Sequence, residues 1–196
     1  YLLLIHHFCY PQVLMKSQII CHLRNSYFLV ELSRMNFIAY IPDLVVLGLI
    51  YIYFLRKRWR NNRPYAHFFF YLSFCFVFLV TLSPFLWDIP HLFSGVYNRY
   101  NFNPFVDLVN GYGSPLQECI ENIILFIPFA FLLRYTYHTS FWNAFFLGVL
   151  FSICIEVTQP LISSIRVCDI TDMITNSIGA LIGCGFYSLL HKLHLA

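Results

Sequence analysis

Long apolar stretches separated by short polar segments dominate the chain from Phe37 onward. A helix needs about 20 mostly apolar residues to cross a bilayer, with a range of roughly 17 to 25. Five stretches meet this requirement: residues 37–55, 67–87, 119–135, 141–159 and 172–190. They lack the period-two alternation of a membrane β-barrel. The pattern therefore predicts an all-α fold, a polytopic integral membrane helical bundle with about five transmembrane helices.

Composition supports this class. Of 196 residues, 59% are hydrophobic and 11% are charged, and the mean hydropathy is +0.67. A soluble domain of this size needs more polar surface to cover its core, so a soluble enzyme is excluded. The net charge of +3 is small and dispersed along the chain, which argues against nucleic acid as a partner.

Residues 1–34 fit the pattern poorly. Their apolar run is interrupted by His6, His7 and Pro11, and they show neither the basic start nor the small-residue cleavage site of a signal peptide. Met35 leads directly into the first span. We therefore expect Met35 to be the natural start and residues 1–34 to be a non-native or disordered extension.

A basic loop after the first span predicts the orientation. Its positive residues are Arg56, Lys57, Arg58, Arg60 and Arg63. Loops rich in Lys and Arg stay in the cytoplasm, so the following loops alternate outward and inward. The later acidic residues then all fall on the outer side: Asp88, Asp107, Glu118, Glu121, Glu156, Asp169 and Asp172. We expect a multi-pass cell-membrane protein with its polar cluster outside.

Polar residues in the last three spans follow helical spacing, in which positions three, four or seven apart share a face. The stripes are Asp169 with Asp172 and Asn176, Glu156 with Gln159, and Glu118 with Asn122 or Glu121. Ionisable groups inside a membrane are costly and normally face a bundle interior or a wet cavity. Three such stripes in one leaflet predict a shared outward-facing pocket.

The chemistry of these residues leaves alternatives open. Arg99 and Arg166 suit recognition of phosphate or carboxylate, or ion pairs that fix helix ends. The carboxylates suit a divalent cation or acid–base work, and hard cations prefer oxygen ligands. Alternatively, Asp169 or Asp172 caps the last helix and Glu156 hydrogen-bonds to Asn122 or Asn176. We expect no dedicated metal site and no cofactor, with a divalent cation left open.

Ordered motifs also carry a family resemblance. They comprise Asn103-Pro104-Phe105, residues 121–129, Glu156-Val157-Thr158-Gln159, residues 166–176, and Gly179 with Gly183. Over about residues 101–185 the chain resembles the VanZ family, whose members often have Gly at the position of Ala130. The resemblance implies a bacterial role in resistance to the glycopeptide antibiotic teicoplanin. It divides the chain into a first helix with its basic loop, 35–66, and a VanZ-like four-helix membrane domain, 67–196.

Two functions from different classes follow. The first is glycopeptide resistance or envelope maintenance through an anionic amphiphile, either teicoplanin or a lipid-linked envelope precursor, with membrane lipids as further partners. The second is a membrane enzyme that uses clustered carboxylates on a lipid-linked substrate. Polar residues stop at the outer half of the bilayer, which argues against a transporter. The candidate site comprises Arg99, Asn103, Glu121, Asn122, Glu156, Gln159, Arg166, Asp169, Asp172 and Asn176.

Overall fold

Five helices in the computed structural model are long and apolar enough to cross a membrane, which confirms the predicted fold class. The structure describes residues 37–59, 63–91, 100–111, 113–162 and 166–193. The expected extension 1–34 and the Met35 start lie outside these residues. One compact unit covers Ala39–Ala196.

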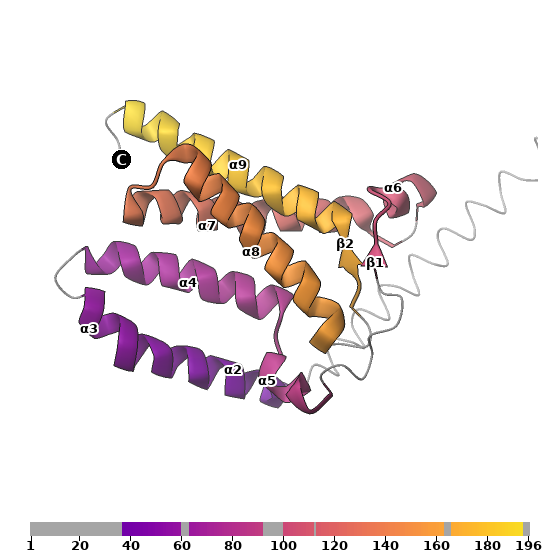
Figure 1. Cartoon of the computed structure of the whole chain (residues 1–196), viewed down its shortest axis with the longest axis horizontal. Helices are drawn as coiled ribbons and strands as arrows, with labels where there is room; N and C mark the ends of the chain where they lie inside the picture. The colour runs from indigo at the N-terminus through magenta and orange to yellow at the C-terminus, as the bar shows by residue number, and fades with distance from the viewer. Residues whose placement is uncertain (1–36, 60–62, 92–99, 112, 163–165, 194–196) are drawn as a thin grey trace, which may run out of the picture. The chain divides into compact units, whose positions relative to one another are not determined.

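The first long element is α2 (Phe37–Ile50), which continues through the π-helical segment η1 (Tyr51–Leu55) into α3 (Arg56–Trp59). The other long helices are α4 (Pro64–Thr81), α7 (Pro115–Tyr137), α8 (Phe141–Ile162) and α9 (Ile170–Lys192). Short elements lie in the connections: α5 (Phe85–Asp88), η2 (Ile89–His91), β1 (Tyr100–Asn101), α6 (Val106–Asn110) and β2 (Cys168–Asp169). Figure 1 shows α7, α8 and α9 packed together, with α4 beside α7.

The closest helix contact joins α7 and α9 through two glycines. A Cβ atom on Gly179 would collide with the carbonyl oxygen of Ile123, and one on Gly183 would collide with that of Ile127. Because lipid tails are as apolar as the side chains, membrane helices associate through such close packing of small residues. Gly179 and Gly183 of α9 therefore pack against α7 of the same chain.

The interior combines a tight apolar core with a few polar groups. Phe126, Ala130 and Ala180 are fully buried in this core, and the Phe151 ring lies 4.9 Å from that of Phe129. Large apolar side chains such as Phe146 remain exposed along the helices. An apolar exterior with polar groups inside is the arrangement that a lipid environment favours.

The second span ends earlier than predicted. It was expected to run to residue 87, but α4 ends at Thr81 and a separate short helix, α5, follows. Proline has no N–H group and disfavours helical backbone in the preceding residue, so Pro84 interrupts the span. The buried Asp43 carboxylate of α2 then accepts hydrogen bonds from the N–H groups of Phe85 (2.7 Å) and Leu86 (2.9 Å).

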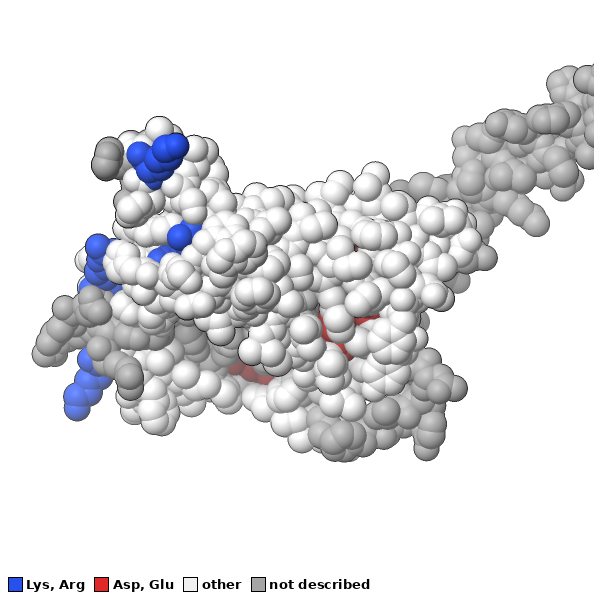
Figure 2. Space-filling view, turned by 45° about the horizontal axis from the view of Figure 1, so that its top comes forward, with Lys and Arg blue, Asp and Glu red and all other residues white. Residues whose placement is uncertain are grey.

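Charges separate to the two ends of the bundle. Figure 2 shows Lys and Arg gathered at one end of the visible face, with the few visible Asp and Glu atoms set back from that end and largely covered. We call one end acidic, because it carries all the described carboxylates: Asp43, Asp88, Asp107, Glu118, Glu121, Glu156, Asp169 and Asp172. The other, basic end carries Arg56, Lys57, Arg63, Arg134, His138, His191 and Lys192. Hydrogen bonds between helices identify which helix ends lie together. At the acidic end Gln159 donates to the Thr81 carbonyl oxygen, and at the basic end Thr136 donates to the Ala66 carbonyl oxygen.

A parallel pair of very short strands, β1 and β2, was not predicted. Tyr100 pairs with Cys168, and Asn101 with Asp169. The pair ties the connection before α6 to the residues that lead into α9. It therefore positions the start of α9 at the acidic end.

Candidate functional site

Glu156 of α8 is the most buried carboxylate of the predicted cluster, with 1% of its surface exposed. Its Oε2 atom accepts a hydrogen bond from the backbone N–H of Asp169 at 3.1 Å. The predicted bonds from Glu156 to Asn122 or Asn176 are replaced by this contact, because those amides bond elsewhere. Glu156 thereby joins the end of α8 to the start of α9.

Asp169 occupies the N-cap of α9, which confirms the capping interpretation for this residue. Its Oδ1 accepts from the Thr171 N–H at 2.7 Å, and its Oδ2 accepts from Asn101 Nδ2 at 2.8 Å. A carboxylate here also interacts favourably with the positive end of the helix dipole. Thr171 extends the network, since its hydroxyl accepts from the Phe105 N–H at 3.0 Å.

Asp172 and Asn176 share a face of α9 but contact different helices. Asn122 Nδ2 of α7 donates to Asp172 Oδ1 at 2.8 Å, whereas Asn176 Nδ2 donates to Ser152 Oγ of α8 at 3.1 Å. Asn176 is 1% exposed, and its Oδ1 has no hydrogen-bond partner among the described residues. The predicted stripe thus connects α9 to both neighbours rather than to one cavity.

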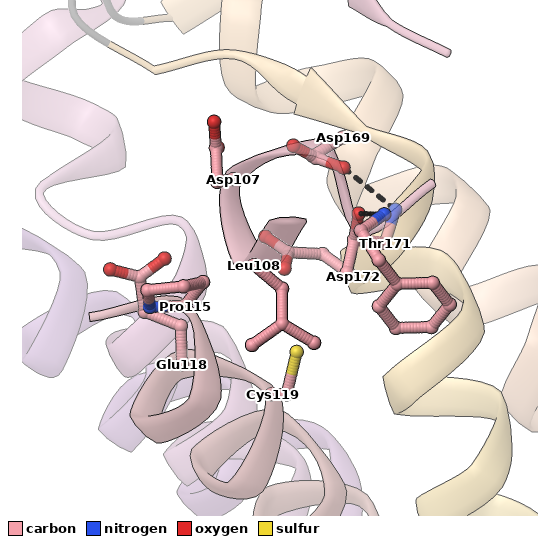
Figure 3. Close-up of a pocket in the computed structure, with 9 residues that line it drawn as sticks. Asp107, Leu108, Pro115, Glu118, Cys119, Asp169, Thr171 and Asp172 are labelled. Atoms are coloured by element: carbon pink, nitrogen blue, oxygen red, sulfur yellow. Dashed lines mark hydrogen bonds between the residues drawn. The ribbon is translucent and has the colours of Figure 1, made fainter. Parts of the chain in front are cut away.

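A small pocket opens between α6, α7 and the start of α9 (Figure 3). It is lined by Phe105, Asp107, Leu108, Pro115, Glu118, Cys119, Asp169, Thr171 and Asp172. Its cavity volume is about 20 Å³, enough for a water-sized group. Figure 3 shows the four carboxylates arranged around the Leu108 side chain. Within the described part of the chain, no group of three or more His, Cys, Asp or Glu side chains is arranged to hold a metal ion.

The pKa of Cys168, which lies next to this pocket, is affected by burial and by the nearby negative charges. Burial raises the pKa of its thiol above the ordinary value, and Glu156, Asp169 and Asp172 raise it further. The thiol is therefore neutral near pH 7. A field that disfavours a thiolate also disfavours an anion placed among the same carboxylates.

Arg166 and Gln159 lie toward α4 rather than in the pocket. Arg166 Nη2 donates to the Ser83 carbonyl oxygen at 3.1 Å, and Gln159 Nε2 donates to the Thr81 carbonyl oxygen at 3.2 Å. Burial lowers the pKa of Arg166, while Tyr40, Asp88 and Glu156 act in the opposite direction. An arginine keeps its proton under such opposing effects, so a positive charge remains beside the end of α4.

The remaining candidates are dispersed. Glu121 is exposed on α7, where its carboxylate accepts from Gln117 Nε2 at 2.6 Å. Asn103 is also exposed, and it is Asn101 that bonds to Asp169. Arg99 lies outside the described residues. Asn101 and Thr171 were missed by sequence reasoning, although both lie inside or beside the motifs that drew attention to the region.

The fold and the cluster define a polytopic helical membrane protein with a network of carboxylates and amides at one end. The sequence model of the VanZ/LLP1 family matches residues 68–191, so the chain belongs to that family. It is also 33% identical over 107 residues to Protein VanZ of Enterococcus faecium. That alignment covers 54% of this chain and 63% of the relative, less than two thirds of its length. Comparison with solved structures finds no match.

Proposed function

We propose that the protein lowers susceptibility to glycopeptides such as teicoplanin by binding an anionic amphiphile at the acidic end, which faces outward. One observation carries the proposal: at the acidic end, α7, α8 and α9 are joined by partly buried polar contacts. Asn122 bonds to Asp172, and Glu156 bonds to the backbone of Asp169. Burying such groups in a membrane is costly, so a bundle that needed only stability would not favour them. Membership in the VanZ/LLP1 family supports the phenotype.

In this proposal Arg166 binds the anionic group. It is the described cation at the acidic end, and its guanidinium has donors beyond the one that reaches Ser83. A phosphate or carboxylate would engage those donors in a planar arrangement. The ligand's anionic group must avoid the carboxylate-lined pocket, where Asp107, Glu118, Asp169 and Asp172 would repel it.

Susceptibility measurements test the proposal. In a teicoplanin-sensitive Gram-positive host, expression of the chain should raise the inhibitory concentration of teicoplanin. The double variant Arg166→Ala, Asp172→Asn should return it to the level of the host without the protein, because it removes the guanidinium that binds the anion and the charge of the carboxylate that accepts from Asn122. Lys57→Ala, an exposed charge change at the basic end, is the matched control and should retain protection at equal membrane levels. Equal protection by the double variant would defeat the binding role of this end.

Membrane labelling tests the orientation. Asn110 is exposed on α6 at the acidic end, and Lys57 is exposed on α3 at the basic end. Positive residues favour the cytoplasmic side. A membrane-impermeant maleimide added to intact cells should therefore label Asn110→Cys above the background of the parent, and should label Lys57→Cys only after the cells are opened. The reverse pattern would place the candidate site in the cytoplasm.

The pocket of four carboxylates favours a second candidate, an enzyme acting on a lipid-linked envelope substrate. Carboxylates together with a substrate phosphate would bind a divalent cation, since Mg²⁺ needs few protein ligands when phosphate supplies others. The strains of the susceptibility experiment separate the two candidates. An enzyme would change the lipid-linked products of the membrane, and the double variant would restore them. Binding alone would protect the host while leaving those products unchanged.

A further inference from the structure

A second polar pocket lies at the basic end, away from the candidate site. It is lined by Arg134, His138, Thr139, Tyr187, Ser188 and His191, and its cavity volume is about 270 Å³. The lining comes from the end of α7, the turn before α8 and the last turns of α9. No described carboxylate lies at this end, so the pocket is positively charged.

Arg134 has hydrogen-bond acceptors for only some of its N–H donors. Its Nη1 donates to the Cys184 carbonyl oxygen at 2.7 Å and to the Ser188 hydroxyl, and its Nε donates to the Thr139 carbonyl oxygen at 3.4 Å. The guanidinium lies over the Tyr187 ring, with its Cζ atom 4.6 Å from the centroid. These contacts hold α7 against α9 and fix the guanidinium in place. Among the described residues, nothing accepts a hydrogen bond from Nη2.

The Thr139 hydroxyl is a second polar group without a hydrogen-bond partner among the described residues. Its oxygen atom is buried. Buried polar atoms are almost always hydrogen-bonded, so an unpartnered hydroxyl on the pocket wall indicates a missing ligand or water. A purely structural role for Arg134 explains the α7–α9 contact but explains neither this hydroxyl nor the pocket.

We propose that this pocket binds a phosphate group, carried by the headgroup of an anionic membrane phospholipid. Arg134 would bind the phosphate through Nη2, Thr139 would donate its hydroxyl hydrogen, and His138 and His191, which also line the pocket, would donate ring N–H groups. Arginine suits phosphate because its donors match the oxygen spacing. Basic pockets between helices at the cytoplasmic surface are suited to anionic headgroups. The proposal does not depend on the function of the acidic end.

Lipid titration of the purified full chain in mild detergent, followed by native mass spectrometry, tests the proposal. Phosphatidylglycerol should bind more tightly than phosphatidylcholine, whose headgroup carries a compensating cation. Arg134→Gln should weaken phosphatidylglycerol binding roughly ten-fold, as expected for loss of a charge-assisted contact. Lys192→Ala is the matched control, because it removes an exposed positive charge beside His191 that does not line the pocket.

Two further arms make the result decisive. Arg134→Gln removes the bridge between α7 and α9, so the double variant His138→Ala, His191→Ala and the single variant Thr139→Val test the pocket with that bridge intact. Each should also weaken phosphatidylglycerol binding. Inorganic phosphate added as a competitor identifies the source. Displacement at a phosphate concentration similar to that of the lipid indicates a site for free phosphate and overturns the headgroup assignment, whereas displacement only at large excess, or none, supports it. Equal phosphatidylglycerol binding by the parent, Thr139→Val and the double variant would overturn the proposal.

Discussion

Alanine at Gly179 or Gly183 is expected to destabilise the bundle strongly, although alanine is the better helix former. The added methyl group would meet the Ile123 carbonyl oxygen in the first case and the Ile127 carbonyl oxygen in the second. Neither contact can be relieved by a side-chain rotation, because both obstacles are backbone atoms. The two helices must separate, at a cost typical of overpacking, about 1–3 kcal/mol or more for each variant.

Gly185→Ala and Gly48→Ala are the matched controls, since a Cβ atom at either position meets nothing within 4 Å. Relief of the helix penalty of glycine, up to about 1 kcal/mol, should leave these variants as stable as the parent or slightly more stable. Thermal unfolding followed by size-exclusion chromatography of detergent-solubilised protein would measure all four. If the melting temperature of Gly179→Ala equalled that of Gly185→Ala, the close α7–α9 contact would not exist in the membrane protein.

The number of spans could be predicted because membrane thickness imposes a minimum length on every apolar helix. The end of the second span could not, because it depends on a residue far away in the sequence. Asp43 accepts from the backbone of residues 85 and 86 and so stabilises a new short helix where the apolar run continues. The hydropathy of a segment contains no information about a hydrogen bond to a distant residue. The strands of two residues each also leave no periodic signal.

The candidate site was predicted in part for a similar reason. Helical spacing placed Asp172 and Asn176 on one face of α9, and the separation of acidic from basic ends followed from the order of the loops. Spacing does not specify which neighbour each side chain meets. Asp172 contacts α7 and Asn176 contacts α8, because α9 lies between the two helices. Asn101 could not be predicted as a partner of Asp169, because that contact depends on the pairing of β1 with β2.

Asp43 was not among the predicted functional residues, yet it shares the burial of Glu156. It is 1% exposed and lies in the first span, where an ionisable group is costly unless its oxygens are bonded. Its carboxylate meets the N–H groups of Phe85 and Leu86 and the Ser83 hydroxyl. The Ser83 carbonyl oxygen in turn accepts from Arg166. Asp43 therefore stabilises the segment of residues 83–86, to which Arg166 of the candidate site is hydrogen-bonded.

Asp43→Ala is accordingly expected to lower stability by several kcal/mol, because each buried donor left without an acceptor costs about 1–3 kcal/mol. Ser83→Ala removes one donor and should cost less, while Asp107→Ala, an exposed carboxylate, should stay within about 0.5 kcal/mol of the parent. Thermal unfolding in detergent would rank the three variants. Arg166 should also lose its fixed position, so Asp43→Ala protein that still reaches the membrane should give weakened teicoplanin protection. If Asp43→Ala had the same melting temperature as the parent protein, the turn between α4 and α5 would not depend on α2.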